Sequence, residues 1–67
     1  MSLGNRLVEL RKVLGFTQTE LAKRLGISRG SLSMYEIDKR EPDNNTLNKI
    51  ADFFDVSTDY LLCRTDI

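Results

Sequence analysis

A run of small, flexible and hydrogen-bonding side chains lies on one face of a predicted helix over residues 28–36. Gly30, Ser33, Met34 and Ile37 point to this side, and Arg29 stands near the N-terminus of the helix. Arginine can donate two hydrogen bonds to one guanine, serine can donate or accept one, and an apolar side chain can contact a thymine methyl group. Glycine would let the helix backbone approach a groove closely. A face meant only for water usually carries Lys and Glu, so this side is predicted to contact DNA. The residues predicted to contact bases are Arg29, Gly30, Ser33 and Met34.

Two of these base contacts have alternatives. Arg29 could contact a phosphate instead of a base, because arginine binds both. Met34 could pack in a dimer interface or in the protein core, because methionine fills irregular apolar gaps. For both residues, base recognition is the favoured interpretation.

Five other polar residues are suited to contacts with the DNA backbone. They are Thr17, Gln18, Ser31, Lys39 and Arg40. The first two stand where a helix over 18–25 begins, and a helix N-terminus favours phosphate through its free N–H groups and its dipole. The last two form a basic pair just after the helix over 28–36. The alternatives are that Thr17 and Gln18 only start a helix and that the two cations are simply solvated.

The chain between residues 17 and 36 predicts two helices joined by a tight turn. Thr17 followed three residues later by Glu20 is a capping box, which favours a helix start. Gly26 can end that helix in the left-handed conformation, and Ser28 can cap the next one. Two short helices joined by a turn with a glycine are typical of a helix-turn-helix, whose second helix enters the major groove of DNA.

Three further helices complete the expected fold. A helix over residues 3–14 is predicted by leucines at helical spacing. These are Leu3, Leu7, Leu10 and Leu14. Asp43 and Ser57 can cap helices over 44–54 and 58–62. The sequence therefore predicts an all-α protein, a compact five-helix bundle in which the second and third helices form the helix-turn-helix.

The chain resembles the DNA-binding domain of the phage repressor and Cro family, the XRE-like regulators. The residues that carry the resemblance are Gln18, Ala22, Gly26, Ile27, Leu32, Tyr35 and Glu36. It continues through KREP, TLNKIADFF and VSTDYLL, and so covers nearly the whole chain from Leu3 to Leu62. The resemblance implies a lambda-repressor-like fold in which Gln18 contacts the DNA backbone.

Two turns depart from the family pattern. The family usually has glycine where this chain has Asp38, and often Gly or Asn where it has Asp55. Asp tolerates the left-handed conformation better than most residues. Both turns are therefore expected to form.

A structural ion pair is expected between Arg11 and Glu36. Helical projection places each charge about 70° from the centre of an apolar face, at the margin of the core. A partly buried carboxylate without a partner costs several kcal/mol. The resemblance implies the same pair. The alternative is two independently solvated charges.

Ten basic and ten acidic residues give a net charge of zero, whereas nucleic-acid-binding domains are usually basic. The charge is polarised along the chain. Residues 1–40 contain eight Lys or Arg and four Asp or Glu, and residues 41–67 contain two and six. The basic part holds the predicted helix-turn-helix.

The 67 residues allow one domain, residues 1–67. Cys63 is the only cysteine and there is no histidine, which excludes an intrachain disulfide and a Cys/His zinc cluster. No group of residues is suited to acid-base or nucleophilic chemistry, so neither an enzyme nor a cofactor, metal or small-molecule ligand is predicted. Without a signal-peptide core or a span-length apolar run, the protein is expected to be cytoplasmic, with no membrane contact.

The predicted function is sequence-specific binding of double-stranded DNA by a transcriptional regulator, with repression as the expected outcome. One such domain covers only a few base pairs, so a homodimer on a palindromic operator is expected, with half-sites about one helical turn apart. Candidates for the dimer interface are Phe53, Tyr60 and Leu61 in the acidic half. The alternative is a protein-interaction module, antitoxin-like or adaptor, because fold alone does not fix function.

Overall fold

Each helix begins with a polar residue whose side chain accepts a hydrogen bond from a backbone N–H of the first turn. The structure is a computed structural model that describes residues 1–66, and none of these residues lies in a strand. The helices are α1 (Leu3–Val13), α2 (Gln18–Leu25), α3 (Arg29–Glu36), α4 (Asn44–Phe54) and α5 (Thr58–Leu61). Their N-caps are Ser2, Thr17, Ser28, Asp43 and Ser57. Because the first turn of a helix lacks internal acceptors, these residues fix where each helix starts.

All five helices also end in the same way. A residue in the left-handed conformation follows each one, and these residues are Gly15, Gly26, Asp38, Asp55 and Cys63. The N–H groups of that residue and the next bind the carbonyls three and five residues earlier, as Gly15 does with Lys12 and Phe16 with Arg11. This is the Schellman motif. Asp38 and Asp55 thus adopt the conformation expected of them, with φ of 58° and 55°.

The predicted five-helix, all-α architecture is confirmed, but three helix ends differ by one residue. Ser28, predicted as the first residue of the third helix, is the N-cap that precedes α3. Leu62, predicted as the last residue of the fifth helix, comes just after α5. Leu14 likewise follows α1, because the Schellman motif at Gly15 turns the chain away. The Leu14 side chain is 51% exposed, so its place in the inward leucine stripe was predicted wrongly.

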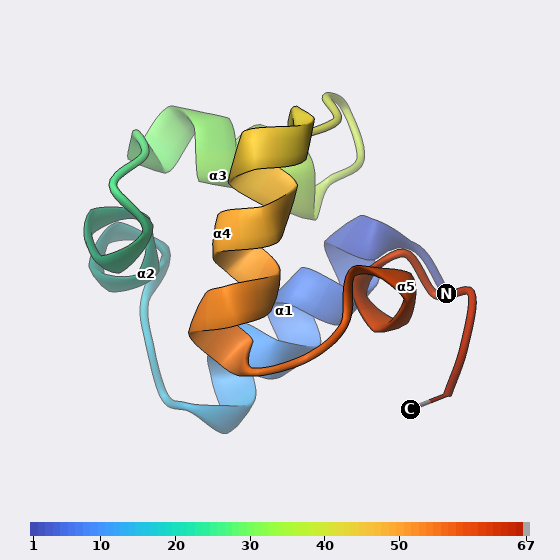
Figure 1. Cartoon of the computed structure of the whole chain (residues 1–67). Coiled ribbons are helices and arrows are strands. Elements are labelled where there is room, and N and C mark those ends of the chain that lie inside the picture. Colours follow the sequence, from blue (N-terminus) through green and yellow to red (C-terminus); the bar gives the residue numbers. More distant parts are fainter. Residues whose placement is uncertain (67) are drawn as a thin grey trace.

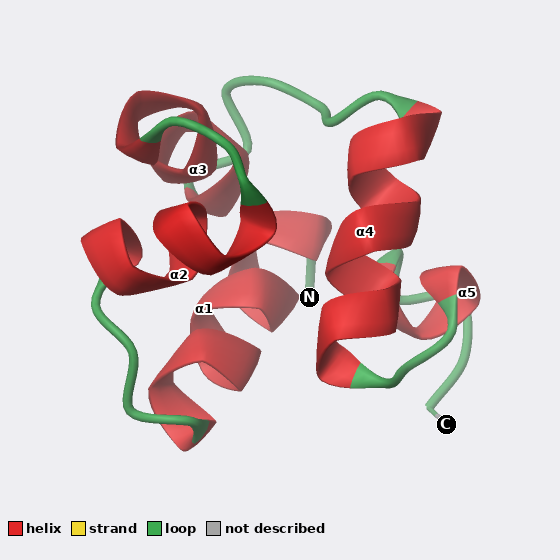
Figure 2. Ribbon diagram, turned by 60° about the vertical axis from the view of Figure 1, so that its left-hand side comes forward, coloured by secondary structure: helices red, strands yellow, loops and turns green. Residues whose placement is uncertain are grey.

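The core contains one fully buried aliphatic side chain from each helix. These are Leu7, Leu21, Leu32, Ile50 and Leu61. Truncating a buried leucine or isoleucine to alanine costs about 2–5 kcal/mol, so this layer fixes the relative positions of the helices. In Figure 1 α4 stands in front of α1, and Figure 2 shows α1, α2 and α3 on one side of the core with α4 and α5 on the other.

Candidate DNA interface

The turn between α2 and α3 has the geometry of a helix-turn-helix. The Glu20 carboxylate accepts a hydrogen bond from the backbone N–H of Thr17, and the Thr17 hydroxyl accepts one from the N–H of Glu20. These contacts complete the predicted capping box, and the bond from the Thr17 N–H in particular lowers the pKa of the Glu20 carboxyl. Gly26, with φ of 70°, and the cap at Ser28 then reverse the chain directly into α3.

The face of α3 opposite the core is open to solvent. Leu32 and Tyr35 are buried behind it. Arg29, Gly30 and Met34 are exposed, and Ser33 is half-buried. Met34 is 39% exposed, which argues against the core-packing alternative for this residue.

Gly30 is not required by the packing of the protein. A Cβ at this position would meet only the Ser28 hydroxyl oxygen, at 4.0 Å. The protein itself therefore has room for a larger side chain at position 30. A small residue on this face has an advantage only when something outside the molecule approaches the helix.

Glu36 joins the first three helices through a buried network. Its carboxylate accepts hydrogen bonds from Arg11 Nε at 2.8 Å and Arg11 Nη2 at 3.2 Å. Gln18 Nε2 donates a third, at 2.9 Å. The Glu36 side chain is only 3% exposed and that of Arg11 14%. The structure thus contains the ion pair expected between Arg11 and Glu36, and adds Gln18 to it.

Gln18 links this network to the exposed face. While its amide nitrogen donates inward to Glu36, its carbonyl oxygen lies 3.5 Å from Nη1 of Arg29. The amide nitrogen has a second hydrogen, which the bond to Glu36 does not use. Gln18 is therefore held in place from inside, at the start of α2, beside the side chain expected to read a base.

The connector between α3 and α4 carries the exposed basic pair Lys39 and Arg40. Arg40 lies back over α3, with Nη1 3.5 Å from the Ser31 hydroxyl oxygen and its guanidinium carbon 5.6 Å from the Tyr35 ring centroid. The Arg40 side chain therefore lies against α3, and Lys39 is exposed next to it in the connector. Thr17, which caps α2, is also exposed.

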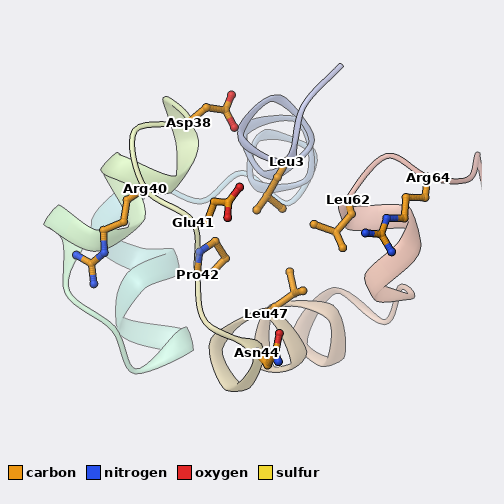
Figure 3. Close-up of a pocket in the computed structure, with 9 residues that line it drawn as sticks. All are labelled: Leu3, Asp38, Arg40, Glu41, Pro42, Asn44, Leu47, Leu62 and Arg64. Carbon is orange, nitrogen blue, oxygen red and sulfur yellow. The ribbon is translucent and has the colours of Figure 1, made fainter.

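A hollow of about 450 Å³ lies beside the connector between α3 and α4, on the side away from the open face of α3 (Figure 3). Leu3, Leu47 and Leu62 point into it, whereas the guanidinium of Arg40 points away from these leucines. The hollow does not include the open face of α3.

Two charged residues have roles that the sequence reasoning missed. Asp38 accepts hydrogen bonds from Ser2 and Gly4 at the start of α1. Arg6 is 9% exposed and lies 3.9 Å above the Tyr60 ring, and its Nε has no hydrogen-bond partner in the described part of the chain. The burial of Arg6 could have been predicted from the sequence, because helical spacing places it between Leu3 and Leu10 on the inner side of α1.

The candidate dimer residues do not form one open surface. Leu61 is fully buried, so its assignment to a dimer interface was wrong: α5 turns this side chain into the core. Phe53 packs against Phe16 and Phe54 and is half-buried. Tyr60 is half-buried over Arg6.

Nothing in the described residues forms a cluster of three or more potential metal ligands. Among the same residues, none of the helices has the length and apolar character needed to cross a membrane.

Comparison with known proteins gives consistent matches over most of the chain, including the turn between α2 and α3. A helix-turn-helix family profile matches residues 7–61. The HTH-type transcriptional regulator ImmR of Bacillus subtilis is 49% identical over the whole chain, which spans 53% of the length of ImmR. The P22 c2 repressor bound to a synthetic operator superposes with a TM-score of 0.88 and 32% identity, covering 92% of this chain and 94% of that one. SinR in complex with DNA gives a TM-score of 0.80, also with 32% identity, over 88% and 95% of the two chains.

Proposed function

The chain belongs to the helix-turn-helix family of transcriptional regulators, and from this premise we propose that it binds a specific DNA operator through the open face of α3. The observation that carries the proposal is that face itself. It combines Arg29, Ser33 and Met34 with a glycine that the protein's own packing does not require. The P22 c2 repressor bound to a synthetic operator and SinR in complex with DNA, which share this fold, support it.

Roles follow from the position of each residue. Arg29, Gly30, Ser33 and Met34 would face base edges. Contacts with the sugar-phosphate backbone would come from Thr17, Gln18, Ser31, Lys39 and Arg40. The uneven charge distribution supports this division, because the excess of cations falls in residues 1–40 although the chain as a whole is neutral.

Salt dependence tests the proposal most directly. Fluorescence anisotropy with a random duplex should show affinity that falls as salt rises, with a slope of about 0.9 for each phosphate neutralised. Lys39→Ala should lower that slope by about 0.9 and weaken all sequences alike. Affinity that does not change with salt would refute DNA binding.

Arg29→Ala tests the base-reading assignment in the same assay. After selection of a preferred site from a random library, this variant should lose preference at one base pair, by about 1–3 kcal/mol. A uniform loss across all sequences would instead place Arg29 on a phosphate.

A dimer on a palindromic operator, with repression as its consequence, is the finer part of the proposal. The symmetry of a selected site tests it, because two copies require half-sites about one helical turn apart.

Tyr60 and Phe53 remain candidates for the contact between copies. Light scattering of Tyr60→Asp should show a smaller mass than the parent protein, and an unchanged mass would exclude Tyr60. Transcription from a promoter that overlaps the selected site should fall when the protein is added.

A protein-interaction module is the second candidate, favoured by two exposed apolar residues, one on α3 and one just after it. Met34 is 39% exposed, and Ile37 just after the helix is 56% exposed. The same part of the chain also carries the exposed cations Arg29, Lys39 and Arg40, however, and apolar side chains together with cations are also suited to a DNA groove. The salt series distinguishes the two functions, because a protein-binding module has no reason to bind random DNA.

A further inference from the structure

The Asp38 carboxylate binds the start of α1, thirty-four or more residues away in the sequence. One oxygen accepts a hydrogen bond from the Ser2 hydroxyl at 2.6 Å, and the other accepts one from the backbone N–H of Gly4 at 3.0 Å. The first turn of a helix lacks internal acceptors and carries the positive end of the dipole, so a carboxylate there is favourable. A glycine at position 38 would offer neither bond.

Gly4 brings the two segments into direct contact. A Cβ at this position would lie 2.5 Å from the carbonyl oxygen of Glu36 and 2.8 Å from that of Tyr35. The start of α1 is therefore packed against the backbone of the last turn of α3. Asp38 completes this contact from the connector side.

The same connector carries the two cations assigned to phosphates. Lys39 follows Asp38 directly, and its N–H binds the carbonyl of Met34 at 3.0 Å. In Figure 3 the Asp38 carboxylate and the Arg40 guanidinium leave the connector in different directions, and only Arg40 points away from α1. Asp38 thus holds the side of the connector that faces α1, while the Arg40 guanidinium lies on the other side.

We propose that Asp38 is a positioning residue, which clamps the connector to the start of α1 and so holds Lys39 and Arg40 where they reach DNA phosphates. This inference rests on the proposed function. It assigns a role to the position where the resembling family usually has glycine.

Charge alone predicts the opposite effect. An acidic side chain next to two phosphate-binding cations weakens the attraction of DNA. If Asp38 acted only as a charge, removing it would strengthen binding. If it acts as a clamp, removing its acceptor oxygens should weaken binding relative to a variant of the same charge that keeps an acceptor.

Two variants with the same charge separate these effects, Asp38→Gly and Asp38→Asn in the full chain. Both residues accept the left-handed conformation, but only asparagine keeps an oxygen for the Gly4 N–H and an amide for the Ser2 hydroxyl. With random duplex DNA, the Gly variant should bind about three- to tenfold more weakly than the Asn variant, because ordering a flexible side chain costs affinity. The salt slope should be the same for both, since the phosphate contacts still form.

Amide hydrogen exchange in the free protein gives a readout that does not depend on DNA. The N–H of Lys39 should exchange faster in the Gly variant than in the Asn variant. Urea titrations of both variants define conditions under which each is folded, and exchange and binding are compared there.

Equal affinity and equal exchange in the two variants would overturn the proposal. Tighter binding by the Gly variant than by the Asn variant would also overturn it. If the parent protein showed no salt-dependent binding to DNA, the proposed function would fail instead. The exchange data would then show separately whether the clamp exists.

Discussion

Replacing Glu36 by glutamine tests the buried network that joins α1, α2 and α3. A carboxylate presents two acceptor oxygens, which Arg11 and Gln18 share, whereas glutamine presents one oxygen and a competing donor. Removing one partner of a buried ion pair costs about 3–5 kcal/mol because the other charge stays buried. Arg11 keeps some contact with water at 14% exposure, so the lower end, about 3 kcal/mol, is expected.

This loss is large for a domain of 67 residues, whose total stability is expected to be about 3–10 kcal/mol. With a urea dependence of about 1 kcal/mol per molar, the unfolding midpoint followed by circular dichroism should fall by about 3 M.

Asp59→Asn is the matched control. Asp59 pairs with Arg64 at 3.9 Å with both side chains mostly exposed, so its loss should change stability by less than about 0.5 kcal/mol. A midpoint for Glu36→Gln no lower than that of Asp59→Asn would refute the reasoning.

Three further substitutions or conditions have defined outcomes. Gly30→Ala should raise the unfolding free energy by up to about 1 kcal/mol in a urea titration, because alanine favours helix, yet it should weaken DNA binding in anisotropy; tighter binding would remove the reason given for a glycine on that face. Gly4→Ala should lower the unfolding free energy by about 1–3 kcal/mol, because the added methyl group meets backbone oxygens that cannot move freely, and a urea midpoint equal to that of the parent would contradict this. Stability should also fall in acid. Backbone N–H donors, from Thr17 and Thr46 respectively, lower the pKa of Glu20 and Asp43 in the folded state, so their contribution is complete above the ordinary values of 4.5 and 3.8 and is lost as pH falls through the lower folded-state values. Glu20→Gln and Asp43→Asn should each make the dependence of the urea midpoint on pH shallower.

Helix boundaries were predictable because the signals for them are local. A serine, threonine or aspartate stands at every start, and at four of the five ends a glycine or aspartate takes the left-handed conformation. The leucine spacing of α1 and the Leu32 and Tyr35 pair of α3 also indicated the buried faces. The prediction that Leu14 faces the core was wrong, because the helix ends at the Schellman motif formed by Gly15 before the leucine spacing is completed.

Contacts between distant segments were harder to predict. The ion pair between Arg11 and Glu36 could be predicted, because in the sequence both charges lie beside the apolar face of a helix. The bonds from Asp38 to Ser2 and Gly4 depend on how α1 crosses α3, which no spacing in the sequence reveals. Leu61 was misplaced because a helix of four residues is too short for its periodicity to identify the inward side. Gln18 was assigned to the DNA backbone alone, and its bond to Glu36 depends on the packing of α2 against α3.

The contact between the two ends of the fold has a consequence for protein engineering. The Cys63 thiol donates to the carbonyl oxygen of Ser2 at 3.4 Å, so the residue before α1 and the residue that ends α5 are in contact, and in Figure 1 the start of the chain lies beside α5. A short peptide could join them and the chain could be reopened at the exposed Gly15, giving a circular permutant. Closing so short a gap carries a small entropic cost. In that permutant α1 would follow α5 in sequence, while α2 and α3 would remain one uninterrupted unit at the new N-terminus.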